Sequence, residues 1–138
     1  AVMRSKQEGT IPAGSIVIWD TFGELGQLYQ LADAVFVGGS LAPLGGQNFL
    51  EPLALGRIPC CGPHLDNFAF GEAERDSLET LGLLQIGENA KAVATLLQQQ
   101  LAAPTHHDAV RERFQRWLAP RLGGSARCAQ RLLDEMVK

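Results

Sequence analysis

The sequence has little that could cross-link a small domain covalently. It contains three cysteines: Cys60 and Cys61 are adjacent in an apolar run, and Cys128 lies in a segment with helical character. An odd number of cysteines without a CxxC spacing is typical of neither a disulfide framework nor a zinc site. No cluster of His, Cys, Asp and Glu has metal-ligand spacing. We therefore expect buried, reduced thiols and no metal site.

Long hydrophobic runs and an excess of positive charge are also missing. No apolar run approaches the ~18 residues that a membrane span requires, and no secretory signal opens the chain. Lysine and arginine are spread along the sequence and the formal net charge is -3, which makes nucleic acid a poor partner. The first residue is not methionine, which favours a piece of a longer protein.

What the sequence does contain suits one globular domain, which we expect to cover residues 1–138. The chain is 46% hydrophobic and 20% charged, and roughly two-thirds of the surface of an unfolded chain of this size can be buried. Glycine is abundant, with 15 residues. This abundance indicates several tight turns or close approaches of the backbone.

Short apolar runs alternate with segments of helical periodicity. The runs lack the alternation of half-exposed strands, which is typical of parallel strands buried on both faces; they lie at residues 1–3, 15–19, 34–37, 58–61 and 83–86. The helical segments lie at residues 22–32, 48–55, 67–81 and 89–101. This alternation predicts an α/β fold with an open parallel sheet flanked by helices.

The last third of the chain has a different pattern. It predicts two C-terminal helices, at residues 107–118 and 125–137, separated by the Pro/Gly break APRLGG. The second helix carries an apolar stripe of Ala129, Leu132, Leu133 and Met136. This stripe either covers the edge of the sheet or docks on another domain.

Two expected strand-to-helix junctions carry polar residues, at the edge where open parallel sheets bind ligands. In WDTFGELG, Thr21 and Glu24 have the spacing of a capping box, and in GGQNFLEP so do Asn48 and Glu51. Capping alone explains this spacing. It does not explain the ten residues of glycine-bearing loop, 38–47, that precede Asn48. Glycines allow close approach of a ligand and a helix start attracts anions, so the residues favour an anion or nucleotide site here.

The three histidines are weaker candidates. His64 follows the expected strand at 58–61 and is either a ligand contact or a solvated or capping residue. His106 and His107 lie in a polar linker, where we expect them to be exposed. The standard phosphate motifs GxxxxGK[ST] and GxGxxG are missing, as is the GxSxG of esterases.

Several linked motifs resemble one family. DTFGEL, FVGGSL, GGQNFLEP and GPHLDNF, with an Arg-Ser pair upstream at 4–5, occur in order. Together they resemble the C-terminal domain of the transferases of 3-deoxy-D-manno-octulosonic acid (Kdo) in lipopolysaccharide synthesis. The resemblance is dense over about half of the chain and loose over the rest.

The resemblance implies the C-terminal, Rossmann-like half of a GT-B glycosyltransferase, which binds the nucleotide sugar CMP-Kdo. It implies inverting transfer without a metal or other cofactor. An absent N-terminal domain would bind the lipid A precursor, hold the catalytic carboxylate base and contact the cytoplasmic face of the bacterial inner membrane. The chain alone, a soluble piece, is then expected to be inactive.

The resemblance also implies the residues of the donor site. The residues expected to line the CMP phosphate and sugar are Ser40, Gly45, Gly46, Gln47 and Asn48. Glu51 is expected to bind hydroxyl groups of the donor, above all those of the ribose. The nucleotide is expected to be bordered by Thr21, Gly23 and Glu24. At position 47 the family usually has His, so that Gln47 keeps hydrogen bonding but loses the ability to change charge. A GT-B domain for another nucleotide sugar, such as a UDP-sugar, and a non-catalytic nucleotide-binding module are the alternatives.

Overall fold

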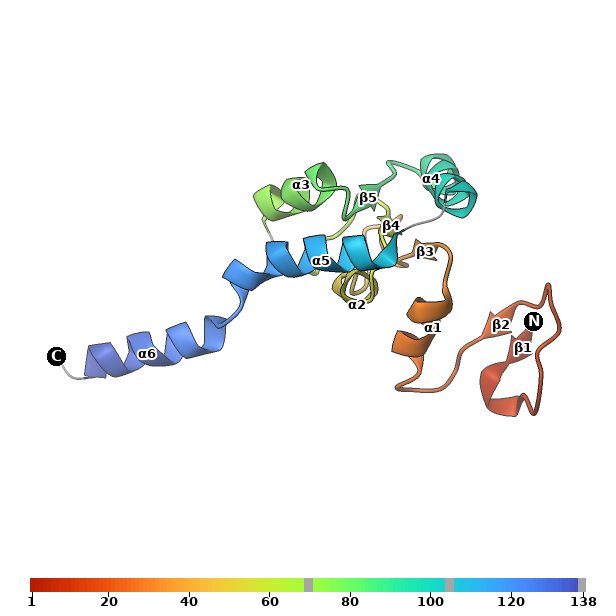
Figure 1. The fold of residues 1–138 in the computed structure, drawn as a ribbon, viewed down its shortest axis with the longest axis horizontal. Helices are drawn as coiled ribbons and strands as arrows, with labels where there is room; N and C mark the ends of the chain where they lie inside the picture. Colours follow the sequence, from red (N-terminus) through yellow and green to blue (C-terminus); the bar gives the residue numbers. More distant parts are fainter. Residues whose placement is uncertain (69–70, 104–105, 137–138) are drawn as a thin grey trace.

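The computed structural model describes residues 1–68, 71–103 and 106–136. A short two-stranded parallel sheet opens the chain: β1 (Val2–Met3) pairs with β2 (Val17–Ile18), and the 3-10 turn η1 (Arg4–Lys6) lies between them. Helix α1 (Leu25–Leu31) connects this sheet to the rest of the molecule. Figure 1 shows β1 and β2 standing apart from the other strands, with α1 in between.

The second sheet is parallel and has three strands in the order β3-β4-β5. Strand β3 (Val35–Phe36) pairs with β4 (Pro59–Cys61), and β4 pairs with β5 (Gln85–Ile86). The crossover helices are α2 (Leu50–Ala54) and α3 (Glu72–Thr80). Helix α4 (Ala90–Ala102) follows β5 and packs against β4. The α/β class with parallel strands and flanking helices is therefore confirmed, with the strands divided between two sheets.

Two helices end the described chain, as the sequence predicts. Helix α5 (His107–Leu118) packs against α2 and leads through η2 (Ala119–Arg121) to α6 (Gly124–Met136). In Figure 1, α6 runs on from α5 and away from the sheet. Its apolar side chains are exposed, Met136 at 82%. Of the two alternatives for this stripe, covering the sheet edge is therefore wrong for this structure.

The core lies between the three-stranded sheet, α2, α3 and α5. Its fully buried side chains include Leu53 of α2 and Leu78 of α3, and α5 contributes Val110, Phe114 and Trp117. The Phe114 and Trp117 rings stack with centroids 5.9 Å apart. Trp117 Nε1 also donates to Ser77 Oγ at 3.2 Å, which satisfies the indole inside the core. Helix α5 is thus an integral part of the domain.

Hydrogen bonds of Arg57 and His107 link α1, α2 and α5. Arg57, just after α2, donates through Nε to the carbonyl oxygen of Tyr29 at 2.8 Å and also bonds the carbonyl oxygen of Gln30. Its guanidinium contacts the ring of His107, whose Nδ1 donates to the Gly56 carbonyl oxygen at 3.1 Å. The expectation that His107 is exposed is therefore wrong, because its ring is held between α5 and the end of α2.

Most sequence-predicted elements are present with different ends. Each expected strand is shorter, at two or three residues, and residues 107–118 match α5 fully. The helix expected at 67–81 begins at Glu72, and residues 69–70 of that prediction lie outside the described residues. Helix α6 begins one residue early, at Gly124, and Val137 also lies outside the described residues.

The position of α5 in the core gives a stability prediction. Phe114 is 3% exposed, so Phe114→Ala should lower the free energy of unfolding by about 3–5 kcal/mol through lost burial and a cavity. Leu133→Ala on α6, 57% exposed, should change it by less than about 0.5 kcal/mol. Urea denaturation measures both, and equal losses would contradict the different burial of α5 and α6.

The cysteines give a second prediction. Burial raises the pKa of Cys60 to about 11 and that of Cys61 to about 12, whereas Cys128 is exposed on α6, against the expectation of buried thiols. Because the thiolate is the reactive form, Ellman's reagent at pH 8 should titrate one thiol rapidly and the other two only after denaturation. Cys128→Ser should remove the rapid phase. Rapid reaction of a second thiol would contradict the burial of β4.

Candidate functional site

The loop after β3 carries most of the sequence-predicted donor-binding residues. It leaves the strand at Val37, turns back on itself through residues 38–47 and enters α2. The amide of Gly46 donates to the carbonyl oxygen of Gly39 at 3.0 Å, and the amide of Gln47 donates to the carbonyl oxygen of Gly38 at 3.1 Å. These two bonds close the loop, so its ends lie side by side.

At the end of this loop, Gln47, Asn48 and Glu51 are exposed. Asn48 Oδ1 accepts from the amide of Leu50 at 3.0 Å, and Asn48 Nδ2 donates to Glu51 Oε1 at 2.7 Å. The structure therefore joins Asn48 to Glu51 by their side chains, and the helix itself begins two residues after Asn48. The predicted capping box at Asn48 and Glu51 is therefore wrong, because Phe49 is the N-cap of α2 and Asn48 bonds the amide of Leu50 and the side chain of Glu51 instead.

Ser40 sits on the opposite, inner side of the loop. Its side chain is fully buried, and Oγ donates to the Val37 carbonyl oxygen at 2.6 Å and accepts from the amide of Gly62 at 2.8 Å. These bonds connect the loop after β3 to the loop after β4. Its sequence-predicted role toward a donor stays a prediction, while the structure shows a hydroxyl fully used within the protein.

Gly45 and Gly46 are buried and have positive φ angles of 80° and 72°. A Cβ on Gly45 would lie 2.4 Å from the Asn67 side chain, and one on Gly46 would lie 2.8 Å from Leu65. The glycines of this pair are thus required by packing of the protein on itself. The interpretation that they clear space for a ligand needs correction, because the cleared space is already filled.

The junction after β2 holds a second polar cluster. Glu24 Oε2 accepts from Thr21 Oγ1 and from Trp19 Nε1, each at 2.8 Å, and lies 3.5 Å from Arg4 Nε. The hydrogen bond from Thr21, then that from Trp19 and the charge of Arg4, hold the pKa of Glu24 below its ordinary value. The predicted capping box at Thr21 and Glu24 is wrong, since Glu24 is itself the N-cap of α1 and neither side chain caps the helix.

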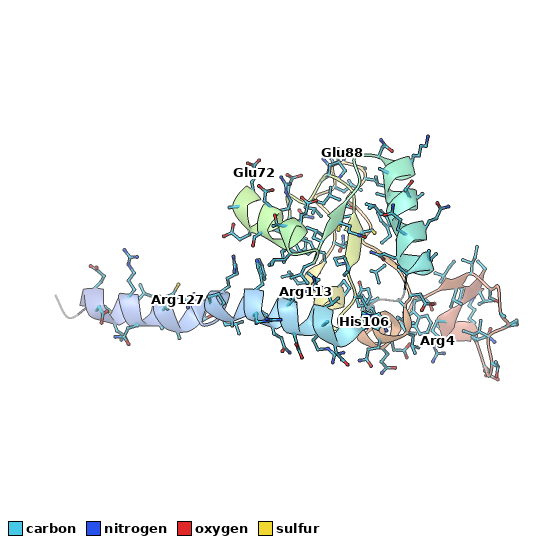
Figure 2. All side chains as sticks on the ribbon, turned by 45° about the horizontal axis from the view of Figure 1, so that its top comes forward. Arg4, Glu72, Glu88, His106, Arg113 and Arg127 are labelled. Atoms are coloured by element: carbon cyan, nitrogen blue, oxygen red, sulfur yellow. The ribbon has the colours of Figure 1, made fainter. Side chains whose placement is uncertain are left out.

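Gly23 and Arg4 also have structural roles in this cluster, and the predicted contact of Thr21, Gly23 and Glu24 with a nucleotide stays a prediction. Gly23 has a φ of 82° with open space around it, so the backbone conformation requires glycine there. Arg4 also lies over the Trp19 ring, 5.5 Å from its centroid. Figure 2 labels Arg4 beside the two-stranded sheet, at the other end of the molecule from Arg127 on α6.

The structure thus divides the predicted site residues into two groups. The group after β3 holds Ser40, Gly45, Gly46, Gln47, Asn48 and Glu51, and the group after β2 holds Thr21, Gly23 and Glu24. Their helices, α1 and α2, pack together, and the charge of Glu51 adds to burial in raising the pKa of Tyr29 on α1.

Three residues of the clusters were missed or misread in the sequence. Asn67 contacts the loop after β3, and Trp19 and Arg4 contact Glu24. Asn67 and Arg4 lie far in sequence from their partners, so spacing gave no signal for them, whereas Trp19 lies only five positions before Glu24 at a spacing that belongs to no capping motif. His64, the weaker candidate, donates its backbone amide to the Ser40 carbonyl oxygen at 3.0 Å, and no ligand role of its ring is tested.

A cavity of about 300 Å³ is lined in part by Phe49, the residue before α2. Its lining includes Leu65, Asp66, Phe68, Glu72 and Arg75, and none of these is a sequence-predicted donor residue. The polar groups at Gln47, Asn48 and Glu51 lie on the open surface, where they can form one wall of a binding site.

The described residues offer no cluster of metal ligands. Within residues 1–68, 71–103 and 106–136, no three His, Cys, Asp or Glu side chains gather closely enough to hold a metal ion. No described helix is both long and apolar enough to cross a membrane. Metal independence of any reaction stays a prediction.

The environment of Glu24 gives a prediction about pH. Thr21→Val removes the largest cause of its lowered pKa, so the pKa of Glu24 should rise toward the ordinary value for glutamate. Carboxyl-resolved NMR titration measures the change. The pKa of Asp20, lowered chiefly by hydrogen bonds from Ser5, serves as the control and should not move. An unmoved Glu24 pKa would contradict the Thr21 contact.

Comparison with known proteins gives similar sequences but no matching family model. The 3-deoxy-D-manno-octulosonic acid transferase of Bordetella pertussis is 36% identical over 123 residues, or 89% of this chain and 28% of that protein. The same-named protein of Haemophilus influenzae is 35% identical over 100 residues, or 72% of this chain and 23% of that protein. The chain thus spans about a quarter of the length of these relatives.

A solved structure is also similar. It is the crystal structure of the C-terminal CMP-Kdo binding domain of WaaA from Acinetobacter baumannii, with a TM-score of 0.61 and 31% sequence identity. The similarity covers 74% of this chain and 52% of that one. On these matches of sequence and fold, the chain belongs to the 3-deoxy-D-manno-octulosonic acid transferase family and corresponds to the C-terminal domain of its members.

Proposed function

We propose that this chain is the donor-binding part of a Kdo transferase and recognises CMP-Kdo. The observation that carries the proposal is the similarity in both fold and sequence to a C-terminal domain described as binding CMP-Kdo. The exposed polar groups at the end of the loop after β3 support it, since they follow a parallel strand on the ligand-binding edge of such sheets.

The chemistry of Gln47, Asn48 and Glu51 suits different parts of a nucleotide sugar. The side-chain amide of Gln47 can donate to phosphate oxygens, whereas the Glu51 carboxylate accepts hydrogen bonds and repels phosphate. Glu51 therefore suits sugar hydroxyls, and Asn48 orients it through the 2.7 Å bond. Helix α2 has five residues, so its dipole adds less to phosphate binding than the sequence suggested.

In the proposed reaction, the bond between the Kdo anomeric carbon and the CMP phosphate oxygen breaks, and a hydroxyl of the acceptor attacks that carbon. The proton of this hydroxyl passes to a carboxylate base, and the phosphate oxygen of CMP takes the bonding electron pair. Residues of this chain hold CMP and favour the charge that develops on it. The base belongs to an N-terminal domain of the whole enzyme in this proposal, so the chain alone does not catalyse transfer.

The wider setting is proposed from the family. The acceptor is a lipid A precursor, the process is lipopolysaccharide synthesis, and the whole enzyme works without a metal at the cytoplasmic face of the bacterial inner membrane. The present chain contributes the nucleotide-sugar site as a single domain over residues 1–138. Its exposed polar cluster forms one wall of the cleft, and the N-terminal domain supplies the other.

Calorimetric titration of the chain with CMP, UDP and ADP tests this proposal. CMP should bind in preference, and Glu51→Ala should weaken CMP binding about tenfold or more, because a hydrogen bond to a charged group contributes about 1.5–3 kcal/mol. Glu112→Ala removes an equal charge from the exposed face of α5 and should leave the affinity unchanged.

Two results would contradict the proposal. Equal affinity for the three nucleotides would remove the support for a CMP-sugar donor, and stronger binding of UDP would favour the UDP-sugar alternative. Unchanged CMP binding in Glu51→Ala, with the fold retained by circular dichroism, would remove Glu51 from the site.

A further inference from the structure

Asn67 attaches the loop after β3 to the loop after β4 by hydrogen bonds. It lies in the loop after β4, and its side-chain Nδ2 donates to the carbonyl oxygens of Leu44 at 3.0 Å and Gly46 at 3.1 Å. Its backbone amide donates to the carbonyl oxygen of Gly45, also at 3.0 Å. One residue thus binds three consecutive carbonyl groups, because the carbonyl oxygens of residues 44, 45 and 46 each accept one hydrogen bond from Asn67.

The glycine pair makes this contact possible. The Asn67 side chain occupies the space into which a Cβ of Gly45 would project, at 2.4 Å. Leu65 and the His64 carbonyl oxygen lie within 2.8 and 3.1 Å of the corresponding position on Gly46. The loop after β3 is therefore pressed against residues 64–67 along its second half.

A second attachment holds the first half of the same loop. The buried Ser40 hydroxyl bonds the amide of Gly62, and the Ser40 carbonyl oxygen accepts from the amide of His64. Residues 41–44 of the loop are exposed, and of these the carbonyl oxygen of Leu44 is bound by Asn67. Ser40 fixes where the loop leaves the strand, and Asn67 fixes the turn that delivers the chain to Gln47 and Asn48.

We propose that Asn67 is a positioning residue for the donor site: it acts through the backbone of residues 44–46 to fix Gln47, Asn48 and Glu51 in their binding arrangement. This inference rests on the proposed function. A ten-residue loop with four glycines has many conformations when it is free. Holding one of them before the ligand arrives removes an ordering cost from binding.

The role depends on the amide group as a hydrogen-bond donor. An aspartate at position 67 has the same shape, but its carboxylate cannot donate and would face two carbonyl oxygens. An alanine removes the same bonds without adding charge. At Asn89, the N-cap of α4, the side chain acts as an acceptor toward the amide of Ala92 at 3.0 Å. Asn89→Asp keeps that bond and adds the same charge, which makes it a matched control.

The experiment measures amide hydrogen exchange and CMP affinity in the same variants of the chain. In Asn67→Ala and Asn67→Asp, the amides of Gly46 and Gln47 should exchange faster, because their bonds to Gly39 and Gly38 depend on the closed loop. The dissociation constant for CMP should rise about tenfold in both, the effect of losing roughly 1.4 kcal/mol of binding. Asn89→Asp should leave the loop amides and the affinity unchanged.

Unchanged exchange in the loop of Asn67→Ala, or faster exchange with wild-type CMP affinity, overturns the inference alone. A rise in the dissociation constant for Asn67→Asp but not for Asn67→Ala also overturns it, because charge repulsion then explains the loss. If the wild-type chain does not bind CMP, the proposed function fails together with the inference.

Discussion

The attachment of the loop after β3 to the loop after β4 is the constraint on which the candidate site depends. Ser40 contributes a hydroxyl that is fully buried and bonded on both sides. An unpaired hydroxyl in that position would be costly, so the two strand ends must lie at the separation that satisfies it. The backbone entering α2 follows from that separation, and with it the exposed positions of Asn48 and Glu51.

The hydrophobic core lies against the inner face of α2, the helix that carries Glu51. Phe49 and Leu53, on either side of Glu51, are buried, so α2 faces inward with its apolar residues and outward with its carboxylate. Helix α5 packs against α2, and the Arg57 contacts bind the end of α2 to α1 and His107. The surface that carries the polar groups therefore lies directly over buried core residues.

The sequence predicts the helices, strand positions and class well, because these follow from local periodicity and from turn residues. The five strand positions and α5 are examples. Linked motifs also led to the family, which the comparisons confirm. The division into two sheets was not predictable in this way, since strand pairing depends on contacts between distant residues and on the space that α1 occupies.

The candidate site shows the same limit. The spacing of Asn48 and Glu51 indicates a local contact, and the structure forms one, through their side chains. The spacing of Thr21 and Glu24 indicates a local contact too, and Thr21 does bond Glu24, but Trp19 and Arg4 also bind that carboxylate and neither Thr21 nor Glu24 caps α1 through its side chain. Nothing in the pattern of residues 38–47 shows that Asn67 fills the space beside Gly45. Glycine spacing reveals that something approaches the backbone, and it does not reveal whether that is ligand or protein.

The contact between Gly45 and Asn67 has a consequence for how such a domain can evolve. A side chain at position 45 cannot coexist with asparagine at position 67, because the two would occupy one space. A smaller residue at 67 does not by itself free position 45, because the φ of 80° there is a backbone conformation that residues other than glycine rarely adopt. Position 45 should accordingly remain glycine among homologous sequences, held both by its own backbone and by a residue far along the chain.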